Sequence, residues 1–202
     1  MTPTGPSTNP QPGAPSISEL SRDLTGLEND YDRISRMALT TERNMPTTGS
    51  STFNGGAAVL ATRGSTEYNL IGDSQLTVNF ATERMSGRAS NFRGFTGNGR
   101  TFNAGGQLTY SGGQIGIGGD PRAFSLTYNG TLNAGGDQMA LRGNATGLFS
   151  GNRSSGPIRT RAVQGISGTA GSITEQAGGT PNMTATVNGN PFVADFVFFG
   201  EN

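Results

Sequence analysis

The stretch from residue 124 to residue 151 constrains the fold most, because apolar and polar residues alternate on both sides of a Gly-rich turn. Phe124, Leu126 and Tyr128 alternate with polar neighbours before the turn, and Met139 and Leu141 do so after it. A repeat of two residues is typical of a strand with one buried face. The stretch therefore predicts an antiparallel β-hairpin, and its second strand ends in a Gly-x-Phe-x-Gly signature.

Weaker forms of this pattern recur through most of the chain after Thr52, separated by turns rich in Gly, Asn, Asp and Pro. The strongest turn signal is Asn188-Gly189, which favours a tight hairpin. About eight strands of this kind predict a mainly β fold, a single antiparallel eight-stranded up-and-down barrel preceded by one amphipathic α-helix. We expect Gly87, Gly147 and Gly165, among other glycines, to point inward and relieve crowding.

Only one face of each predicted strand is apolar, and the other carries Thr, Asn, Ser, Gln and Arg. A single apolar set cannot fill a narrow interior and also face lipid, so we expect a barrel that does not span a membrane. The predicted organisation is a disordered leader rich in Pro, Gly, Ser and Thr (1–15), the helix (16–39), a polar linker (40–51) and the barrel domain (52–202).

The predicted helix begins at a capping box, in which Ser16 and Glu19 satisfy free backbone N–H groups. Apolar residues then recur at spacings of three and four and form one stripe. The stripe favours packing on the outside of the barrel or across one of its ends, and an interface with a partner or with a second copy is the alternative. Its members are Ile17, Leu20, Leu24, Leu27, Tyr31 and Ile34.

The chain lacks His, Cys and Lys, and its 14 Arg balance 14 acidic residues. The absent residue types exclude Ser-His and Cys-His nucleophiles, a Schiff base and the usual structural zinc site. A balanced charge gives no field that would attract nucleic acid. We therefore expect no enzyme, no metal site and no nucleic-acid partner.

A segment dense in Arg and Phe offers candidate partner-binding residues, namely Arg93, Phe95 and Arg100. Arg and aromatic residues are enriched at binding hot spots. A pair of strands with solvated Arg and core Phe is the alternative interpretation of the segment, and the one that we favour. Tyr68 is a further candidate, because we place it in an exposed loop between Arg63 and Asp73. No cofactor is predicted, although a tyrosine can ligate haem iron, and Tyr68 is better exposed for this than Tyr110 or Tyr128.

Short motifs make the last two-thirds of the chain similar to the barrel domain of transferrin-binding protein B and related surface lipoproteins. They are Gly-x-Ala-x-Val at 55–59, Leu-x-Val-x-Phe at 76–80, Gly-Leu-Phe-Ser-Gly at 147–151, Gly-Ile-Ser-Gly-Thr at 165–169 and Phe-Gly-Glu at 199–201. The resemblance implies a barrel filled with side chains, tethered to the outer membrane by a lipidated Cys that is absent here. Binding loops vary in such proteins, so the resemblance assigns no binding residue.

Two functions follow as hypotheses. The first is a non-enzymatic binding protein, at the outer-membrane surface, extracellular or alternatively periplasmic, that captures a protein partner, such as an iron- or haem-carrying protein, through loops at one barrel end. The second is a structural or assembly subunit docked through its helix into a larger complex. The N-terminal sequence fits either a mature form whose export signal has been removed or a native cytosolic start.

Overall fold

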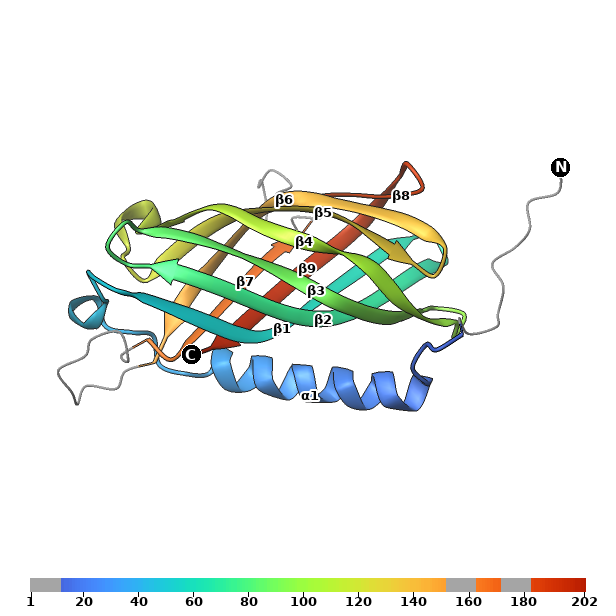
Figure 1. The fold of residues 1–202 in the computed structure, drawn as a ribbon, viewed down its shortest axis with the longest axis horizontal. Coiled ribbons are helices and arrows are strands. Elements are labelled where there is room, and N and C mark those ends of the chain that lie inside the picture. The colour runs from blue at the N-terminus through green and yellow to red at the C-terminus, as the bar shows by residue number, and fades with distance from the viewer. Residues whose placement is uncertain (1–11, 152–162, 172–182) are drawn as a thin grey trace, which may run out of the picture.

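The structure, a computed structural model, describes residues 12–151, 163–171 and 183–202. It contains one α-helix, nine strands and two short 3-10 turns (Figure 1). These elements are α1 (Ile17–Ser35), η1 (Glu42–Asn44), β1 (Ser50–Arg63), β2 (Thr66–Asn79), β3 (Arg84–Thr96), β4 (Thr101–Ile115), η2 (Ile117–Gly119), β5 (Ala123–Ala134), β6 (Asp137–Ser150), β7 (Gly165–Gly171), β8 (Met183–Val187) and β9 (Asn190–Glu201).

The strands form one closed antiparallel barrel. Each strand from β1 to β6 pairs with the next, and β9 pairs back with β1. Both β7 and β8 pair with β6 on one side and with β9 on the other, so these two short strands share a single position in the wall. The barrel therefore has eight strand positions, and the predicted fold class is confirmed. Among the described strands, closure leaves no long edge unpaired.

Aromatic rings fill the middle of the barrel. Phe124, Phe149 and Phe198 are fully buried, and the centroid of the Phe124 ring lies 5.2 Å from that of Phe149 and 6.2 Å from that of Phe198. The Tyr128 ring lies 4.8 Å from Phe196 farther along the same column. Burying each such side chain contributes about 1.5–3 kcal/mol to folding. The alternating residues of the predicted hairpin are thus the core of the fold.

Of two glycines predicted to point inward, one faces the interior of the barrel and the other faces the helix. Gly147 does face the interior, where an added Cβ would lie 2.4 Å from the Phe124 ring and 2.2 Å from the carbonyl oxygen of Ser167. Gly165 faces outward, and its Cβ would meet Ile34 of the helix at 3.0 Å. The prediction for Gly165 is wrong because Ile166 and Ala170, which occupy the alternate positions of β7, are the buried ones.

Two segments depart from the expected boundaries. The helix ends at Ser35 rather than Leu39, because the following residues extend along the end of β6: Leu39 pairs with Ser150, and the Thr40 amide donates to the carbonyl of Phe149. The segment expected to be a loop between Arg63 and Asp73 belongs largely to β2, which pairs there with β1 and β3. Gly72, where the register with β3 shifts, interrupts the alternation that would have revealed the strand.

The helix lies along the outside of the barrel wall and does not plug either end (Figure 1). Its hydrogen-bonded capping box at Ser16 and Glu19 is present as predicted, and this bonding lowers the pKa of Glu19. Among the described residues, no helix combines the length and the apolar character needed to cross a membrane. The leader predicted for 1–15 lies mostly outside the described residues.

Candidate functional site

The helix is seated on the wall by small residues that allow a close approach. An added Cβ on Gly56 of β1 would lie 2.9 Å from Leu27 Cδ1, and also 2.9 Å from the ring of Phe199 on β9. Tyr31 places its ring 6.0 Å from that of Phe199. These contacts lie along the middle and the C-terminal half of α1, where the outer wall offers glycines and an aromatic ring instead of polar side chains.

Among the described residues, two ion pairs join the helix to the barrel. The guanidinium of Arg93 on β3 lies 3.0 Å from the carboxylate of Asp23, and both side chains are about one-third exposed. Arg33 pairs with Glu201 at the end of β9 and with Asp30 one turn earlier in the helix. Hydrogen bonds from Arg33 to Glu201 and Asp30 raise the pKa of Arg33. The pairs fix the direction in which the helix lies more than they add stability, because exposed pairs contribute little.

A groove of about 530 Å³ opens along one edge of the helix. Leu20, Leu24 and Glu28 form this edge, because residues four apart lie on successive turns of the same side. The opposite bank is the outer face of the barrel. Most of the wall side chains that line the groove are apolar, namely Ala58 and Leu60 of β1, Ile71 of β2, Phe95 of β3 and Val197 of β9. The polar ones are Asn69 of β2, Thr169 of β7 and Asp195 of β9.

The groove is apolar and only partly covered. On the helix, the Leu20 side chain is buried and that of Leu24 is half-buried. On the barrel wall, Leu60 remains 40% exposed. A leucine exposed to that degree beside a half-buried one leaves apolar surface in contact with water. The groove size falls within the 300–1,000 Å³ range that is usual for small-molecule sites.

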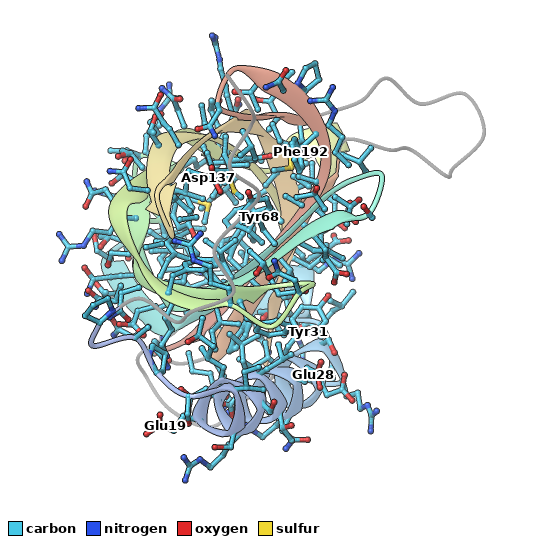
Figure 2. The ribbon with its side chains drawn as sticks, turned by 90° about the vertical axis from the view of Figure 1, so that its right-hand side faces the viewer. Glu19, Glu28, Tyr31, Tyr68, Asp137 and Phe192 are labelled. Carbon is cyan, nitrogen blue, oxygen red and sulfur yellow. The ribbon has the colours of Figure 1, made fainter. Side chains whose placement is uncertain are left out.

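The ionisable groups of the groove are both acidic. Glu28 on α1 and Asp195 on β9 are exposed, and no arginine of the described residues contributes to the lining. Within the described part of the chain, neither carboxylate takes part in an ion pair. Figure 2 shows Glu28 at one side of the helix, with Tyr31 nearer to the barrel. The groove thus combines apolar walls with two negative charges.

Tyr68 lies inside the barrel, so the prediction of an exposed loop residue is wrong. Its side chain is 5% exposed, and its hydroxyl donates a hydrogen bond of 2.7 Å to Asp137 at the start of β6. Asn188, in the predicted tight turn, donates a second bond of 2.7 Å to the same carboxylate. The ring meets Phe102 and Phe192 edge-on, and the Tyr68, Asp137 and Phe192 side chains gather at one barrel end (Figure 2).

Burial, and then the bond to Asp137, raise the pKa of Tyr68. Burial likewise raises the pKa of Tyr110 and of Tyr128, both of which are fully buried in the aromatic column. The Tyr110 hydroxyl lies 3.3 Å from that of Ser74, and the Tyr128 hydroxyl has no hydrogen-bond partner among the described residues. All three tyrosines therefore occupy packing positions.

The structure does not bring the four predicted partner-binding residues together. Tyr68 faces the interior, Arg93 is paired with the helix, and Arg100 donates to the carbonyl of Gly135. Phe95 lines the groove and is half-buried. In the same Arg- and Phe-rich segment, Phe92 and Phe102 are core residues, as the interpretation with solvated Arg and core Phe expects. Phe95 is not a core residue.

The candidate helix interface is largely used within the chain itself. Leu20 and Ile34 are buried, Leu24, Leu27 and Tyr31 are half-buried, and Ile17 at the start of the helix is 48% exposed. Of the alternatives left open, packing on the outside of the barrel is the one that the structure shows. Leu24 belongs to the apolar stripe of the helix and also lines the groove.

Sequence reasoning missed the groove, although the sequence carries a signal for it. A continuous apolar run at 57–61 and another at 196–199 break the alternation of a one-faced strand. Such runs indicate strands that are covered on both faces. Here the second face is the one beneath and beside α1, formed by β1 and β9.

No protein-family model, curated protein or solved structure matches the chain. The similarity to the barrel domain of transferrin-binding protein B therefore stays a prediction. Among the described residues, no group of three or more His, Cys, Asp or Glu side chains is placed to hold a metal ion. The groove is the candidate site that the geometry supports, because it combines an apolar lining with partial exposure.

Proposed function

We propose that this protein is a non-enzymatic binding protein and that it takes its ligand in the groove between α1 and the barrel wall. The observation that carries the proposal is the groove itself, which has a volume of about 530 Å³, is lined mostly by apolar residues and lies at the edge of the seated helix. A largely preformed apolar pocket with a few polar groups is the usual form of a ligand site. Leu24, Leu60 and Phe95 are the side chains that we expect to contact the ligand.

Capture of a protein partner through loops at a barrel end remains a prediction, as does a location at the outer-membrane surface. Two of the residues that suggested such loops, Tyr68 and Arg100, make internal contacts with Asp137 and Gly135. Haem ligation by Tyr68 would require this buried hydroxyl to leave its carboxylate partner. The groove therefore supports a binding function better than the barrel end that carries Tyr68.

A structural or assembly role through the helix is the alternative. Most of the helical stripe already packs on the barrel, with Leu20 and Ile34 buried. Docking into a larger complex through that stripe would first require α1 to leave the wall and break its ion pairs with Arg93 and Glu201. The seated helix thus favours the binding function.

The proposal is tested by blocking the groove with a covalent label. The chain contains no cysteine, so a single introduced cysteine reacts alone. Leu24→Cys places a thiol in the groove, and Asn29→Cys places one on an exposed position of the same helix. Both variants are alkylated with a bulky maleimide and titrated with the neutral apolar dye N-phenyl-1-naphthylamine, whose fluorescence rises in apolar sites.

We expect saturable dye binding to the parent protein and to the labelled Asn29→Cys variant. The labelled Leu24→Cys variant should bind at least about tenfold more weakly, because the label occupies the apolar volume. Absence of saturable binding to the parent would contradict the proposal. Equal binding by the two labelled variants would also contradict it, since the dye would then occupy another site.

A further inference from the structure

We propose that the ligand of the groove is a small amphiphile with an apolar body and a cationic end, such as an alkylammonium group. The inference rests on the proposed function and names the chemical class of its ligand. Three features of the groove carry it: the composition of the walls, the two carboxylates beside them, and the lack of a compensating cation among the described lining residues.

The walls fit an apolar body. Leu24 from the helix, Leu60 from β1 and Val197 from β9 all contribute to the same lining. Water in contact with these side chains is released when an alkyl chain replaces it, which contributes roughly 25 cal/mol for each Å² of apolar surface covered. The cavity volume of about 530 Å³ suits a small molecule.

The charges select the other end of the ligand. Glu28 and Asp195 come from different elements, α1 and β9, and both line the groove. Arg22 and Arg93 line a separate depression on the other edge of α1, together with Asp23. An ammonium group in the groove would therefore meet two carboxylates and, within the described part of the chain, no lining cation.

The same arrangement rejects the opposite amphiphile. A fatty acid would bring its carboxylate into a site that already holds two negative charges, and like charges disfavour each other most at low salt. Phe95 adds an aromatic ring to the lining, and rings attract cations that lie over their faces. The groove thus discriminates by charge as well as by apolar contact.

The test compares amphiphiles that share one chain and differ in charge. Dodecylammonium, dodecanoate and neutral dodecanol displace N-phenyl-1-naphthylamine from the protein at neutral pH, low salt and concentrations below micelle formation. Far-UV circular dichroism is recorded in parallel to verify that the barrel stays folded. We expect dodecylammonium to bind at least about fivefold more tightly than dodecanoate, with dodecanol between them.

The variant that probes the mechanism is Glu28→Gln with Asp195→Asn, which removes both charges and keeps the shapes of the side chains. Its matched control is Glu42→Gln with Glu83→Gln, which changes the net charge equally at exposed positions outside the groove lining. The first variant should bind the two ions within about twofold of each other. The control should keep the preference of the parent, and added salt should weaken that preference.

The outcomes separate the two proposals. Three results would overturn the cationic ligand while leaving the groove as a binding site for the dye. They are equal affinities for dodecylammonium and dodecanoate, a preference for dodecanoate, and a failure of dodecylammonium to displace the dye. A preference that persists in Glu28→Gln/Asp195→Asn overturns it as well, because the selectivity would arise elsewhere. Absence of dye binding to the parent contradicts the proposed function itself.

Discussion

The barrel interior and the groove on its outer wall are both built from apolar side chains, but they are covered to different extents. In the interior, Phe124, Phe149 and Phe198 pack ring against ring and are fully buried. In the groove, Leu24 and Phe95 are half-buried and Leu60 is 40% exposed. The same apolar chemistry therefore stabilises the fold in one place and leaves a surface available for a ligand in the other.

The difference arises because the helix covers only part of the outer wall. Gly56 and Gly165 let α1 approach closely at Leu27 and Ile34. Toward the N-terminal half, Leu60 and Phe95 are larger wall residues, and the groove opens beside Leu20 and Leu24. A seated helix with one uncovered edge is thus a way to build a ligand site on a barrel whose interior is filled.

The largest expected effect is on the interior. Phe124→Ala should lower the free energy of unfolding by about 3–5 kcal/mol, because it leaves a cavity among buried rings. Phe95→Ala, the matched change in the groove, should cost about 1 kcal/mol or less and should weaken dye binding severalfold. Urea denaturation and dye titration measure the two quantities. Similar stability losses for both variants would break the distinction between core and groove.

Alkaline pH tests how dry the interior is. Burial raises the pKa of Tyr110 and Tyr128 above the ordinary value of 10.0, so the unfolded chain loses these protons at lower pH than the folded one. Stability should be unaffected below about pH 10 and should fall above it, by up to about 1.4 kcal/mol per pH unit for each tyrosine. Thermal unfolding between pH 8 and pH 11.5 measures the slope.

The control for this slope is the double variant Tyr110→Phe/Tyr128→Phe, which should lose part of the alkaline decline. At neutral pH, Tyr128→Phe alone should be neutral or slightly stabilising, since the buried hydroxyl has no partner among the described residues. An alkaline slope identical in the parent and the double variant would show that these hydroxyls already contact water in the folded state.

A smaller effect is expected where the helix meets the wall. Gly56→Ala should lower the free energy of unfolding by about 1–2 kcal/mol, because the new methyl group lies 2.9 Å from Leu27 Cδ1. Gly26→Ala has open space around it and should raise stability by up to about 1 kcal/mol, since alanine favours a helix. Denaturation of both variants checks the pair, and a stabilised Gly56→Ala would mean that the helix is not seated there.

The smallest effect concerns the ion pair that orients the helix. Asp23→Asn should cost about 0.2–1 kcal/mol at low salt and less at high salt, because both partners are about one-third exposed. Asp32→Asn, which removes a pair within the helix to Arg36, is the control that leaves the contact with the wall intact. Dye affinity should change for Asp23→Asn and stay the same for Asp32→Asn, because Asp23 pairs with the barrel wall whereas Asp32 pairs within the helix.

The barrel could be predicted because its signal is local. Alternation identified the inward residues of β5 and β6, the capping box located the start of α1, and Asn188-Gly189 located a hairpin turn. The segment around Tyr68 was misjudged because Gly72 and the outward Ile71 interrupt the alternation of β2. Ile71 is apolar and outward because the helix covers it, which is a tertiary fact that the local pattern does not contain.

The groove could not be predicted from the same pattern. It requires knowledge of which strands the helix crosses, and this is decided by Gly56, Gly165 and Phe199, which lie far apart in the sequence. Arg93 and Arg100 illustrate the same limit, since their neighbours in sequence suggest one patch whereas their partners are Asp23 and Gly135. Only the apolar runs at 57–61 and 196–199 hint at a second covered face.

The most direct test of the central claim is to locate a bound ligand by NMR, using protein with labelled Leu and Val methyl groups and dodecylammonium. We predict intermolecular NOEs from the alkyl chain to the methyl groups of Leu24, Leu60 and Val197 in the groove. Leu126 and Leu141, which are buried in the interior, should show none. NOEs to the interior methyl groups instead would contradict a ligand site on the outer wall of the barrel.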